Sequence, residues 1–274
     1  MKESGGGGML LGRHTPVIQD YAPHILHPIS RTIARQHLGI DAAVPFHGAD
    51  LWHAYEMSWL DGTGKPVVRV GRFTVPASSP NIIESKSFKL YLNSLNNTRF
   101  ATEAIAQATI VKDISGVAGA SVSLQLLKAD DPLLAGAALP GECLDDVPVE
   151  PYFGEPQAEQ LRVQSGGPVE ERLYSHLLRS LCPVTGQPDW ATVWLHYCGE
   201  TIERSSLLQY LIAYREHQEF HEQCVERMFC DISRRCGPRL LRIQAFYTRR
   251  GGLDISPFRS TDLDARPLSR LIRQ

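Results

Sequence analysis

An order of elements that occurs twice is the feature that most constrains this fold. In each half of the chain, extended segments come first, helical segments follow, and an alternating strand ends the half. Residues 139–168 separate the halves and are rich in proline, glycine and acidic residues, which is typical of a linker. The order predicts a duplicated α+β unit, in which each copy is an antiparallel sheet with helices packed on one face. The predicted boundaries are 1–44 (N-terminal tail and lead-in), 45–140 (first unit), 141–170 (acidic linker) and 171–274 (second unit).

Local patterns place the elements of the first half. Tyr55, Met57 and Trp59 alternate along one face of an extended segment, and Asp61 begins a glycine-rich turn that predicts a hairpin. In order, we expect a strand over 51–60, a turn at 61–64, a strand over 67–75, a segment over 84–95, a helix over 99–112, and a closing strand in which Val122, Leu124 and Leu126 alternate with polar residues.

The second half is predicted in the same way. Apolar residues recur at helical spacing in two segments, and Gly237 with Pro238 ends the second of them. In order, we expect a strand over 191–197, a turn at 198–200, a helix over 205–215, a helix over 219–235, and a closing strand over 240–248.

Composition limits the class of protein. The 274 residues carry a net charge of −2, which argues against general nucleic-acid binding, and no apolar run is long enough to span a membrane. Residues 1–8 are glycine-rich, without the hydrophobic stretch of a signal peptide, and are expected to be a floppy tail. The six cysteines are therefore expected to be reduced, as in a cytoplasmic protein.

Cys182 and Asp189 form the first candidate group. Proline, glycine and threonine lie between them, so the segment is predicted to be a stiff loop. A cysteine on such a loop can act as a nucleophile, and a nearby carboxyl group can donate a proton. The alternative interpretation is a small buried cysteine and an aspartate that caps the next strand.

His221 and Glu222 begin the longer helix of the second half. Glu222 can accept hydrogen bonds from a ligand, and His221 can transfer protons near neutral pH, although a polar first turn would explain both. His217, His221 and Cys224 are spaced to share one helix face, which resembles a metal site. The segment lacks the H-E-x-x-H pattern and a Cys-x-x-Cys pair, so no metal is predicted.

Two further segments could bind an anionic or base-like ligand. Glu84 can accept hydrogen bonds from a ring, while serines and lysines at 85–89 can bind phosphate, unless the segment is simply the solvated start of a helix. Arg249 and Arg250 precede Gly251 and Gly252, which suggests a phosphate site. The alternative is a solvated basic surface, because ten arginines lie between residue 232 and the C-terminus.

Together, the segments 84–91, 182–189, 219–227 and 247–255 resemble the long-form NADPH-dependent 7-cyano-7-deazaguanine reductases, the nitrile reductases of queuosine biosynthesis. The resemblance extends from about Pro45 to the C-terminus and is weakest between residues 101 and 171. It implies two tandem tunnelling-fold units and reduction of the nitrile to 7-aminomethyl-7-deazaguanine. It also implies a homodimer, and from the charge and the apolar runs we expect neither a direct nucleic-acid partner nor a membrane partner.

The resemblance also implies residue roles. Cys182 would add to the nitrile to give a covalent thioimide, Asp189 would donate the proton, and two NADPH would be consumed per turnover. His221 would be a further catalytic residue. Substrate binding is assigned to Ile83, Glu84, Ser85, His221 and Glu222, and NADPH binding to Ser85, Lys86, Arg250 and Gly251.

Two other functions compete with the reductase. One is a zinc-dependent GTP cyclohydrolase or pterin-type enzyme of the same fold, which would bind zinc through Cys182 or His221. The other is a non-catalytic nucleobase-binding module, in which replacing Cys182 would leave ligand affinity intact. Metal content and turnover distinguish the three.

Overall fold

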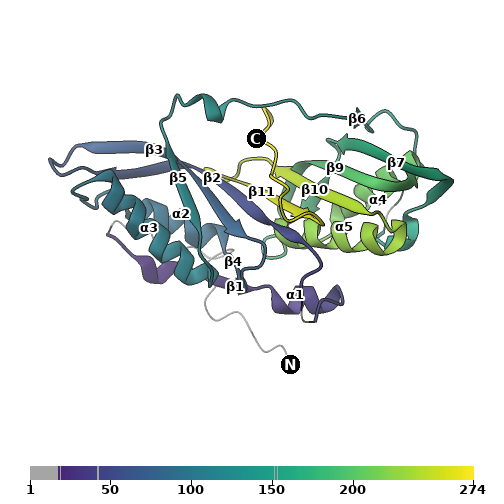
Figure 1. Ribbon diagram of the computed structural model, residues 1–274. Coiled ribbons are helices and arrows are strands. Elements are labelled where there is room, and N and C mark those ends of the chain that lie inside the picture. Colours follow the sequence, from purple (N-terminus) through teal and green to yellow (C-terminus); the bar gives the residue numbers. More distant parts are fainter. Residues whose placement is uncertain (1–17, 19, 42, 151, 153) are drawn as a thin grey trace. The chain divides into compact units, whose positions relative to one another are not determined.

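The structure is a computed structural model that describes residues 18, 20–41, 43–150, 152 and 154–274 (Figure 1). The predicted tail at residues 1–8 lies outside them. The chain packs as two compact units, each built from several segments. Unit 1 comprises the described residues up to Thr32, together with Leu51–Leu134 and Arg249–Asp254, and unit 2 comprises the described residues of Ile33–Asp50, Ala135–Thr248 and Ile255–Gln274.

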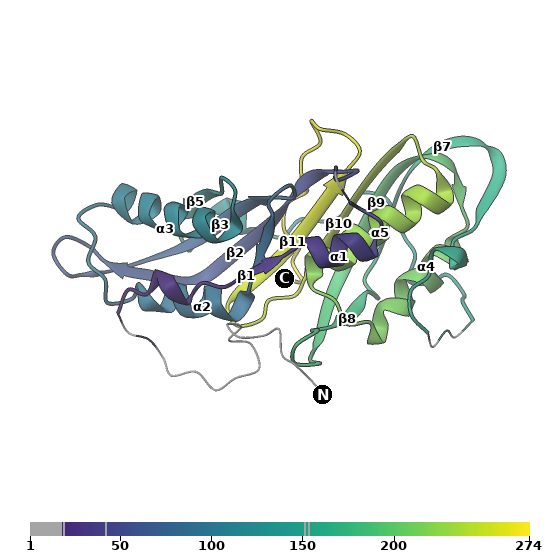
Figure 2. The same ribbon diagram turned by 90° about the horizontal axis from the view of Figure 1, so that it is seen from below.

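Unit 1 is an antiparallel α+β unit. Its long strands are β2 (His47–Leu60, whose first residues belong to unit 2), β3 (Pro66–Pro76) and β5 (Ser123–Leu127), and β3 pairs antiparallel with β5. Short strands β1 (Pro28–Ser30) and β4 (Asn81–Ile83) pair separately. Helices α2 (Ser85–Ser94) and α3 (Glu103–Ala118) lie on one face of the long strands (Figures 1 and 2). Short 3₁₀ helices occur at Pro23–Ile25 and Pro132–Leu134.

An aromatic core joins the strands of unit 1 to α2. The ring of Phe88 lies 5.4 Å from that of Trp52 and 5.0 Å from that of Phe73, both edge to face. All three side chains are almost completely buried. Such pairs stabilise a core beyond their buried area. The alternating pattern of β2 was therefore a reliable guide, since Met57 and Trp59 are also buried.

Unit 2 contains the larger antiparallel sheet. Strands β7 (Val163–Ser175), β9 (Pro188–Ile202) and β10 (Leu240–Tyr247) pair in that order. The strand β11 (Leu253–Ser260) pairs with β10, β8 (Arg179–Leu181) pairs with β9, and β6 (Glu142–Cys143) runs parallel to β7. The helices are α1 (Thr32–His37), α4 (Arg204–Ile212) and α5 (His221–Cys236), with 3₁₀ helices at Ala158–Gln160 and Ala213–Glu216.

Helix α5 packs against β9 and β10 of unit 2. Its predicted apolar face is confirmed, because Cys224, Val225, Met228 and Ile232 have no exposed side-chain surface. The helix ends at Gly237, which adopts the left-handed conformation with φ of 58°. Both α4 and α5 lie on the same side of the unit 2 sheet in Figure 1.

The predicted turn at residues 198–200 is wrong. These residues lie inside β9, where Cys198 pairs with Leu240 and Gly199 pairs with Val169. A β-carbon at Gly199 would approach Pro238 Cα to 3.0 Å, so the glycine permits close contact between chain segments rather than a turn.

Several other boundaries differ from the predictions. The helix expected at 99–112 begins four residues later because Thr102 caps it, with its Oγ1 accepting a hydrogen bond from Ile105 N at 3.3 Å, and it ends at Gly119. Strands β6 and β7 occupy parts of the stretch read as an acidic linker. Polar residues on the exposed face of β7 hid its strand pattern.

A buried charge network joins four elements of unit 2. The guanidinium of Arg259 (β11) donates to Asp50 Oδ1 at 2.7 Å and to Glu226 Oε1 of α5 at 2.8 Å. Arg35 (α1) donates to both oxygens of Glu226, at 2.8 and 2.9 Å. Arg259 is completely buried, so these bonds replace its lost hydration. We call these four residues the Arg259 network.

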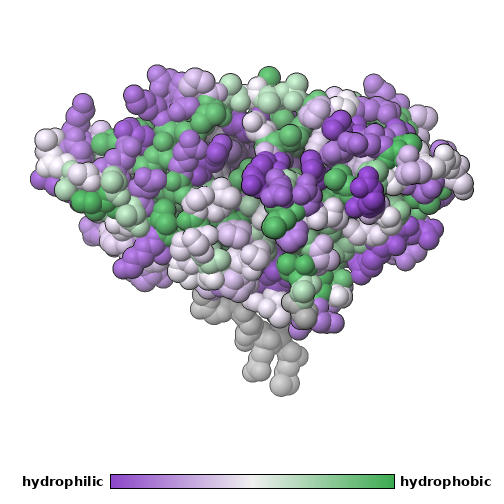
Figure 3. All heavy atoms as spheres, in the orientation of Figure 1, coloured by the Kyte–Doolittle hydropathy of each residue, from purple (hydrophilic) through white to green (hydrophobic). Residues whose placement is uncertain are grey.

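The surface combines polar and apolar residues, which are interspersed on the face shown in Figure 3. Within the described parts of the chain, no helix has the length and apolar character needed to cross a bilayer.

Arg259→Met should reduce the free energy of unfolding by about 3–5 kcal/mol, because it removes the buried guanidinium that forms ion pairs with both Asp50 and Glu226. Urea denaturation followed by tryptophan fluorescence measures the change. The control Arg266→Met removes an exposed arginine and should cost at most about 0.5 kcal/mol. Equal stabilities for the two variants would contradict the role of the network.

Glu171→Gln should destabilise the protein in a pH-dependent manner. Hydrogen bonds from Arg204 lower the pKa of Glu171 below its ordinary value of 4.5. Desolvation raises this pKa in part, and a hydrogen bond from Tyr197 lowers it further. The carboxylate therefore stabilises the fold above pH 4.5, and this contribution disappears as the pH falls through the lowered pKa. Urea denaturation should show a loss of about 2 kcal/mol at pH 7. The loss of stability caused by Glu171→Gln should be smaller in acid. The control Glu159→Gln, at an exposed glutamate, should have little effect on stability at neutral or acid pH. A loss that does not depend on pH would contradict the lowered pKa of Glu171.

Candidate active site

The loop that carries Cys182 connects β8 to β9 in unit 2. The Cys182 amide donates to Gln187 O at 2.9 Å, and the Gly186 amide donates back to Cys182 O at 2.9 Å. Gly186 has a φ of 66°, a conformation that favours glycine. The predicted loop is confirmed, and two backbone hydrogen bonds hold Cys182 at its first position.

The pairing of β8 with β9 relates Cys182 to Asp189. Ser180 pairs with Asp189, so Cys182 lies opposite Gln187 and diagonal to Asp189 on the same face of the hairpin. Asp189 belongs to β9 rather than to the loop. The two side chains are largely shielded from water, with relative exposures of 3% for Cys182 and 7% for Asp189.

His221 is brought to Asp189 by the start of α5. As the first residue of that helix, it places Nε2 3.2 Å from Asp189 Oδ2. Its ring stacks on the ring of Tyr247 (β10), with centroids 3.7 Å apart and an angle of 9° between the planes. Nδ1 is buried and has no hydrogen-bond partner among the described residues. The imidazole is thus fixed in position and keeps one nitrogen available to a ligand or water.

Tyr247 is a site residue that the sequence did not reveal. Its place in the alternating pattern of β10 identified it only as a core residue, and nothing in the sequence indicated that its ring supports His221. Burial, followed by the nearby Cys224 thiol, raises the pKa of Tyr247 well above its ordinary value. Burial also raises the pKa of Cys224, so this thiol remains protonated near neutral pH.

Glu222 follows His221 in the first turn of α5 and is 3% exposed. The predicted shared helix face of His217, His221 and Cys224 is wrong, because His217 precedes α5 and follows the 3₁₀ helix. Its Nδ1 contacts Glu155, and its Nε2 lies 3.0 Å from Glu219 Oε2. Burial lowers the pKa of His217, but these two carboxylates outweigh that effect and raise it.

Glu84 occupies the corresponding end of α2 in unit 1. It caps the helix, and its Oε2 accepts a hydrogen bond from Ser87 N at 2.6 Å. The residue is completely buried, and its Oε1 has no hydrogen-bond partner within the described segments. Ile83 ends β4 and is buried, while Ser85 and Lys86 form the first turn of α2. Glu84 therefore offers an acceptor oxygen that no described residue uses.

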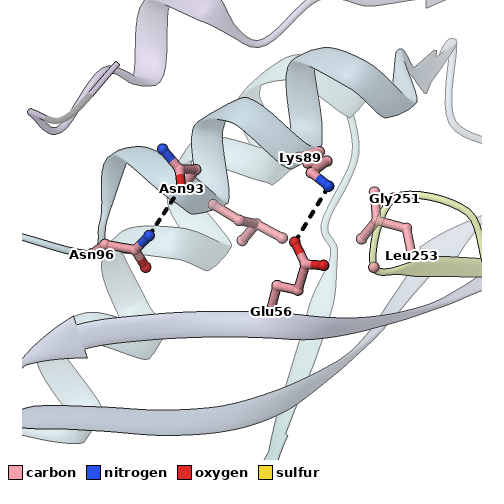
Figure 4. A pocket seen from close by; sticks show the side chains of 8 residues that line it. Glu56, Lys89, Asn93, Asn96, Gly251 and Leu253 are labelled. Atoms are coloured by element: carbon pink, nitrogen blue, oxygen red, sulfur yellow. Dashed lines mark hydrogen bonds and ion pairs between the residues drawn. The ribbon is translucent and has the colours of Figure 1, made fainter. Parts of the chain in front are cut away.

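A small pocket in unit 1 brings Gly251 next to α2 (Figure 4). Lys89 of α2 points into it and lies 3.4 Å from Glu56 Oε2. Gly251 has a φ of 62° and Gly252 a φ of 79°, and a β-carbon on Gly252 would collide with Glu56 at 2.5 Å. Arg249 lies over the Tyr55 ring at 3.4 Å. The glycines thus leave backbone exposed beside a lysine, although an acidic residue shares the pocket.

The structure gathers the predicted site residues into two sets. Unit 2 contains Cys182, Asp189, His221 and Glu222, and unit 1 contains Ile83, Glu84, Ser85, Lys86, Arg250 and Gly251. The first set contains a buried thiol, a carboxyl group paired with an imidazole, and a buried glutamate, which is a suitable combination for covalent catalysis with proton transfer.

Two family models match most of the chain. Residues 17–126 match the family described as nitrile reductase, 7-cyano-7-deazaguanine-reductase N-term, and residues 188–265 match that of QueF-like protein. Among solved structures, the apo archaeosine synthase QueF-Like is similar with a TM-score of 0.31 and 13% identity, covering 38% of this chain and 100% of that one.

Curated relatives cover nearly the whole chain. A protein of Dechloromonas aromatica is 52% identical over 267 residues, which is 96% of this chain and 94% of that protein. One of Stenotrophomonas maltophilia is 52% identical over 268 residues, covering 96% and 97%, respectively. Each is named NADPH-dependent 7-cyano-7-deazaguanine reductase. This chain therefore belongs to the family of NADPH-dependent 7-cyano-7-deazaguanine reductases.

Proposed function

We propose that this protein uses NADPH to reduce the nitrile of 7-cyano-7-deazaguanine to the primary amine of 7-aminomethyl-7-deazaguanine, a step of queuosine biosynthesis. The named relatives support the reaction class. The observation in the structure that carries the proposal is the contact of Asp189 with His221 on the hairpin that holds Cys182. It combines a thiol with a means of delivering protons.

Cys182 acts as the nucleophile. Its sulfur adds to the nitrile carbon, and the carbon–nitrogen triple bond becomes a double bond as the nitrogen takes up a proton, giving a thioimide. Asp189 donates that proton, because it lies diagonal to Cys182 on the same face of the hairpin. The low solvent exposure of Cys182 and Asp189 keeps out water that would hydrolyse the thioimide.

NADPH supplies two hydrides per turnover, which with two protons convert the nitrile to the amine. The first reduction releases Cys182 from the substrate carbon as a thiol and leaves an imine. The second gives the amine. Between these reductions the protein must hold the imine and exclude water, a task suited to the shielded hairpin.

His221 positions the acid and relays protons. Its Nε2 interacts with Asp189, and Tyr247 restricts its ring by stacking. The buried Nδ1, which has no partner in the described parts of the protein, can contact substrate or a water molecule. A fixed imidazole between a carboxyl group and the substrate can return a proton to Asp189 between the two reductions.

Two buried glutamates bind the N–H donors of the guanine-like edge. Glu84 offers Oε1, which accepts no hydrogen bond from the described residues of unit 1. Glu222 is buried in the first turn of α5 in unit 2. The Glu84 carboxylate favours a ring that carries donors, because any other ring would leave its buried Oε1 unpaired. Ile83, Ser85 and His221 complete the proposed substrate contacts.

NADPH is held by Ser85, Lys86, Arg250 and Gly251. Two features of unit 1 favour this assignment. Ser85 and Lys86 place a hydroxyl and an amine at the start of α2, and the backbone of Gly251 lies beside Lys89 in the pocket. Arginine and lysine side chains suit the phosphates of the nucleotide. The pocket in Figure 4 identifies Lys89 as a neighbour of this set.

The assembly is proposed to consist of two tunnelling-fold units over residues 45–140 and 171–274, acting as a cytoplasmic homodimer without nucleic-acid partners. Antiparallel strands with helices on one face within each described unit support this architecture.

Cys182→Ala should lower nitrile-dependent NADPH oxidation at least about 1000-fold, because it removes the sulfur that forms the proposed thioimide. Absorbance at the nicotinamide band measures the rate, and product analysis should give two NADPH per amine. Cys230→Ala is the matched control, because Cys230 is similarly buried but lies on the buried face of α5. This variant should keep activity within about three-fold of wild type. Equal rates for the two variants would refute the role of Cys182, and no oxidation by folded wild-type protein would refute the function.

A further inference from the structure

A second group of reactive side chains lies elsewhere in unit 2, where β6 runs beside the end of β7 (Figure 1). The register places Cys143 opposite Tyr174, and the Leu144 amide donates to Tyr174 O at 2.9 Å. The chain then brings Asp145 to the end of β7, where its Oδ1 accepts from Ser175 Oγ at 2.7 Å and from His176 N at 3.0 Å. Residues some 30 positions apart in sequence are thus fixed together by backbone pairing.

We propose that Cys143, Asp145 and His176 bind a zinc ion. One ligand atom from each residue lies within 4.8 Å of the other two. Zinc binds sulfur at about 2.3 Å and nitrogen at about 2.0–2.1 Å, so the ligand atoms of a tetrahedral site are roughly 3.3–3.8 Å apart. At the 4.8 Å limit, the ligand atoms need to approach one another by about 1 Å, a movement that rotation of the exposed Cys143 side chain can supply.

Neighbouring groups already orient two of the three ligands. His176 Nδ1 lies 2.9 Å from Oγ1 of the buried Thr192, so Nε2 is the ring nitrogen left to a metal when Nδ1 is protonated. The hydrogen bonds at Asp145 Oδ1 restrain the carboxylate. Such supporting contacts to ligating histidines and carboxylates are typical of metal sites.

The donor set selects the class of ion. A thiolate and an imidazole favour zinc and similar transition metals over magnesium or calcium, which prefer oxygen ligands. Three protein ligands leave a fourth position for water, and the exposure of Cys143 gives the ion access. The bound ion would fasten the segment around β6 to the end of β7. No residue is shared with the set around Cys182.

Cobalt provides a direct test, because a cysteine thiolate bound to Co²⁺ absorbs in the near ultraviolet and a tetrahedral site absorbs visibly. Metal-free protein titrated with Co²⁺ should develop both bands at one equivalent, and Zn²⁺ should displace them. Cys143→Ser should lose the near-ultraviolet band, whereas Cys182→Ala and the half-exposed control Cys198→Ser should keep it. A band that persists in Cys143→Ser would overturn the proposal. A band lost only in Cys182→Ala would overturn both this proposal and the proposed function.

Thr192→Val tests the supporting contact independently of the ligands. Loss of the hydroxyl should weaken zinc binding by about 10- to 100-fold, measured by competition with a chromophoric chelator. Circular dichroism shows whether each variant is folded. NADPH oxidation should also be retained by Cys143→Ser, Cys198→Ser and Thr192→Val, since none of these three residues belongs to the proposed catalytic set. Unchanged zinc affinity in both Thr192→Val and Cys143→Ser, or wild-type binding only at millimolar zinc, would contradict the site.

Discussion

The Arg259 network is the interaction on which the geometry of unit 2 depends. One completely buried guanidinium meets carboxylates from β2 and α5, and Arg35 binds the second carboxylate from α1. Two arginines and two acids give a neutral group, which is the condition for burying charge at acceptable cost. Each bond also has a defined direction, unlike apolar contacts, so the network fixes how α5 lies in its unit.

The position of α5 determines the chemistry at its first turn. Glu226 lies in the same helix as His221. The network that holds Glu226 therefore also limits any shift of His221 along the helix axis. Asp189 comes from β9, which packs against α5. A shift of about 1 Å would change a 3.2 Å contact substantially and would slow the proposed proton transfer. The stability of this unit and its proposed catalysis therefore depend on the same helix.

Much of the fold could be predicted from periodicity. The apolar face of α5, its end at Gly237 and the alternation in β10 followed directly from residue spacing. The interior of β9 did not, because Gly199 resembles a turn residue unless the close approach of Pro238 is known. The strand β7 was missed because its exposed face is polar. Local pattern cannot reveal contacts between segments distant in sequence.

The candidate site likewise contains residues that the sequence could identify and residues that it could not. Residue types and motif order led to Cys182 and Asp189, and the hairpin brings them to one face. Tyr247 could not be recognised, since a tyrosine in an alternating strand carries no mark of the ring stacked on it. The group formed by Cys143, Asp145 and His176 was equally hidden, because strand pairing alone unites it.

Covalent attack by Cys182 is the central claim of this account, and intact-protein mass spectrometry tests it most directly. Protein incubated with 7-cyano-7-deazaguanine in the absence of NADPH should gain the mass of one substrate molecule, because the thioimide forms by addition without a leaving group. Cys182→Ala should gain no mass. An adduct that persists in Cys182→Ala, or wild-type protein that turns over the nitrile yet never shows an adduct, would contradict the account.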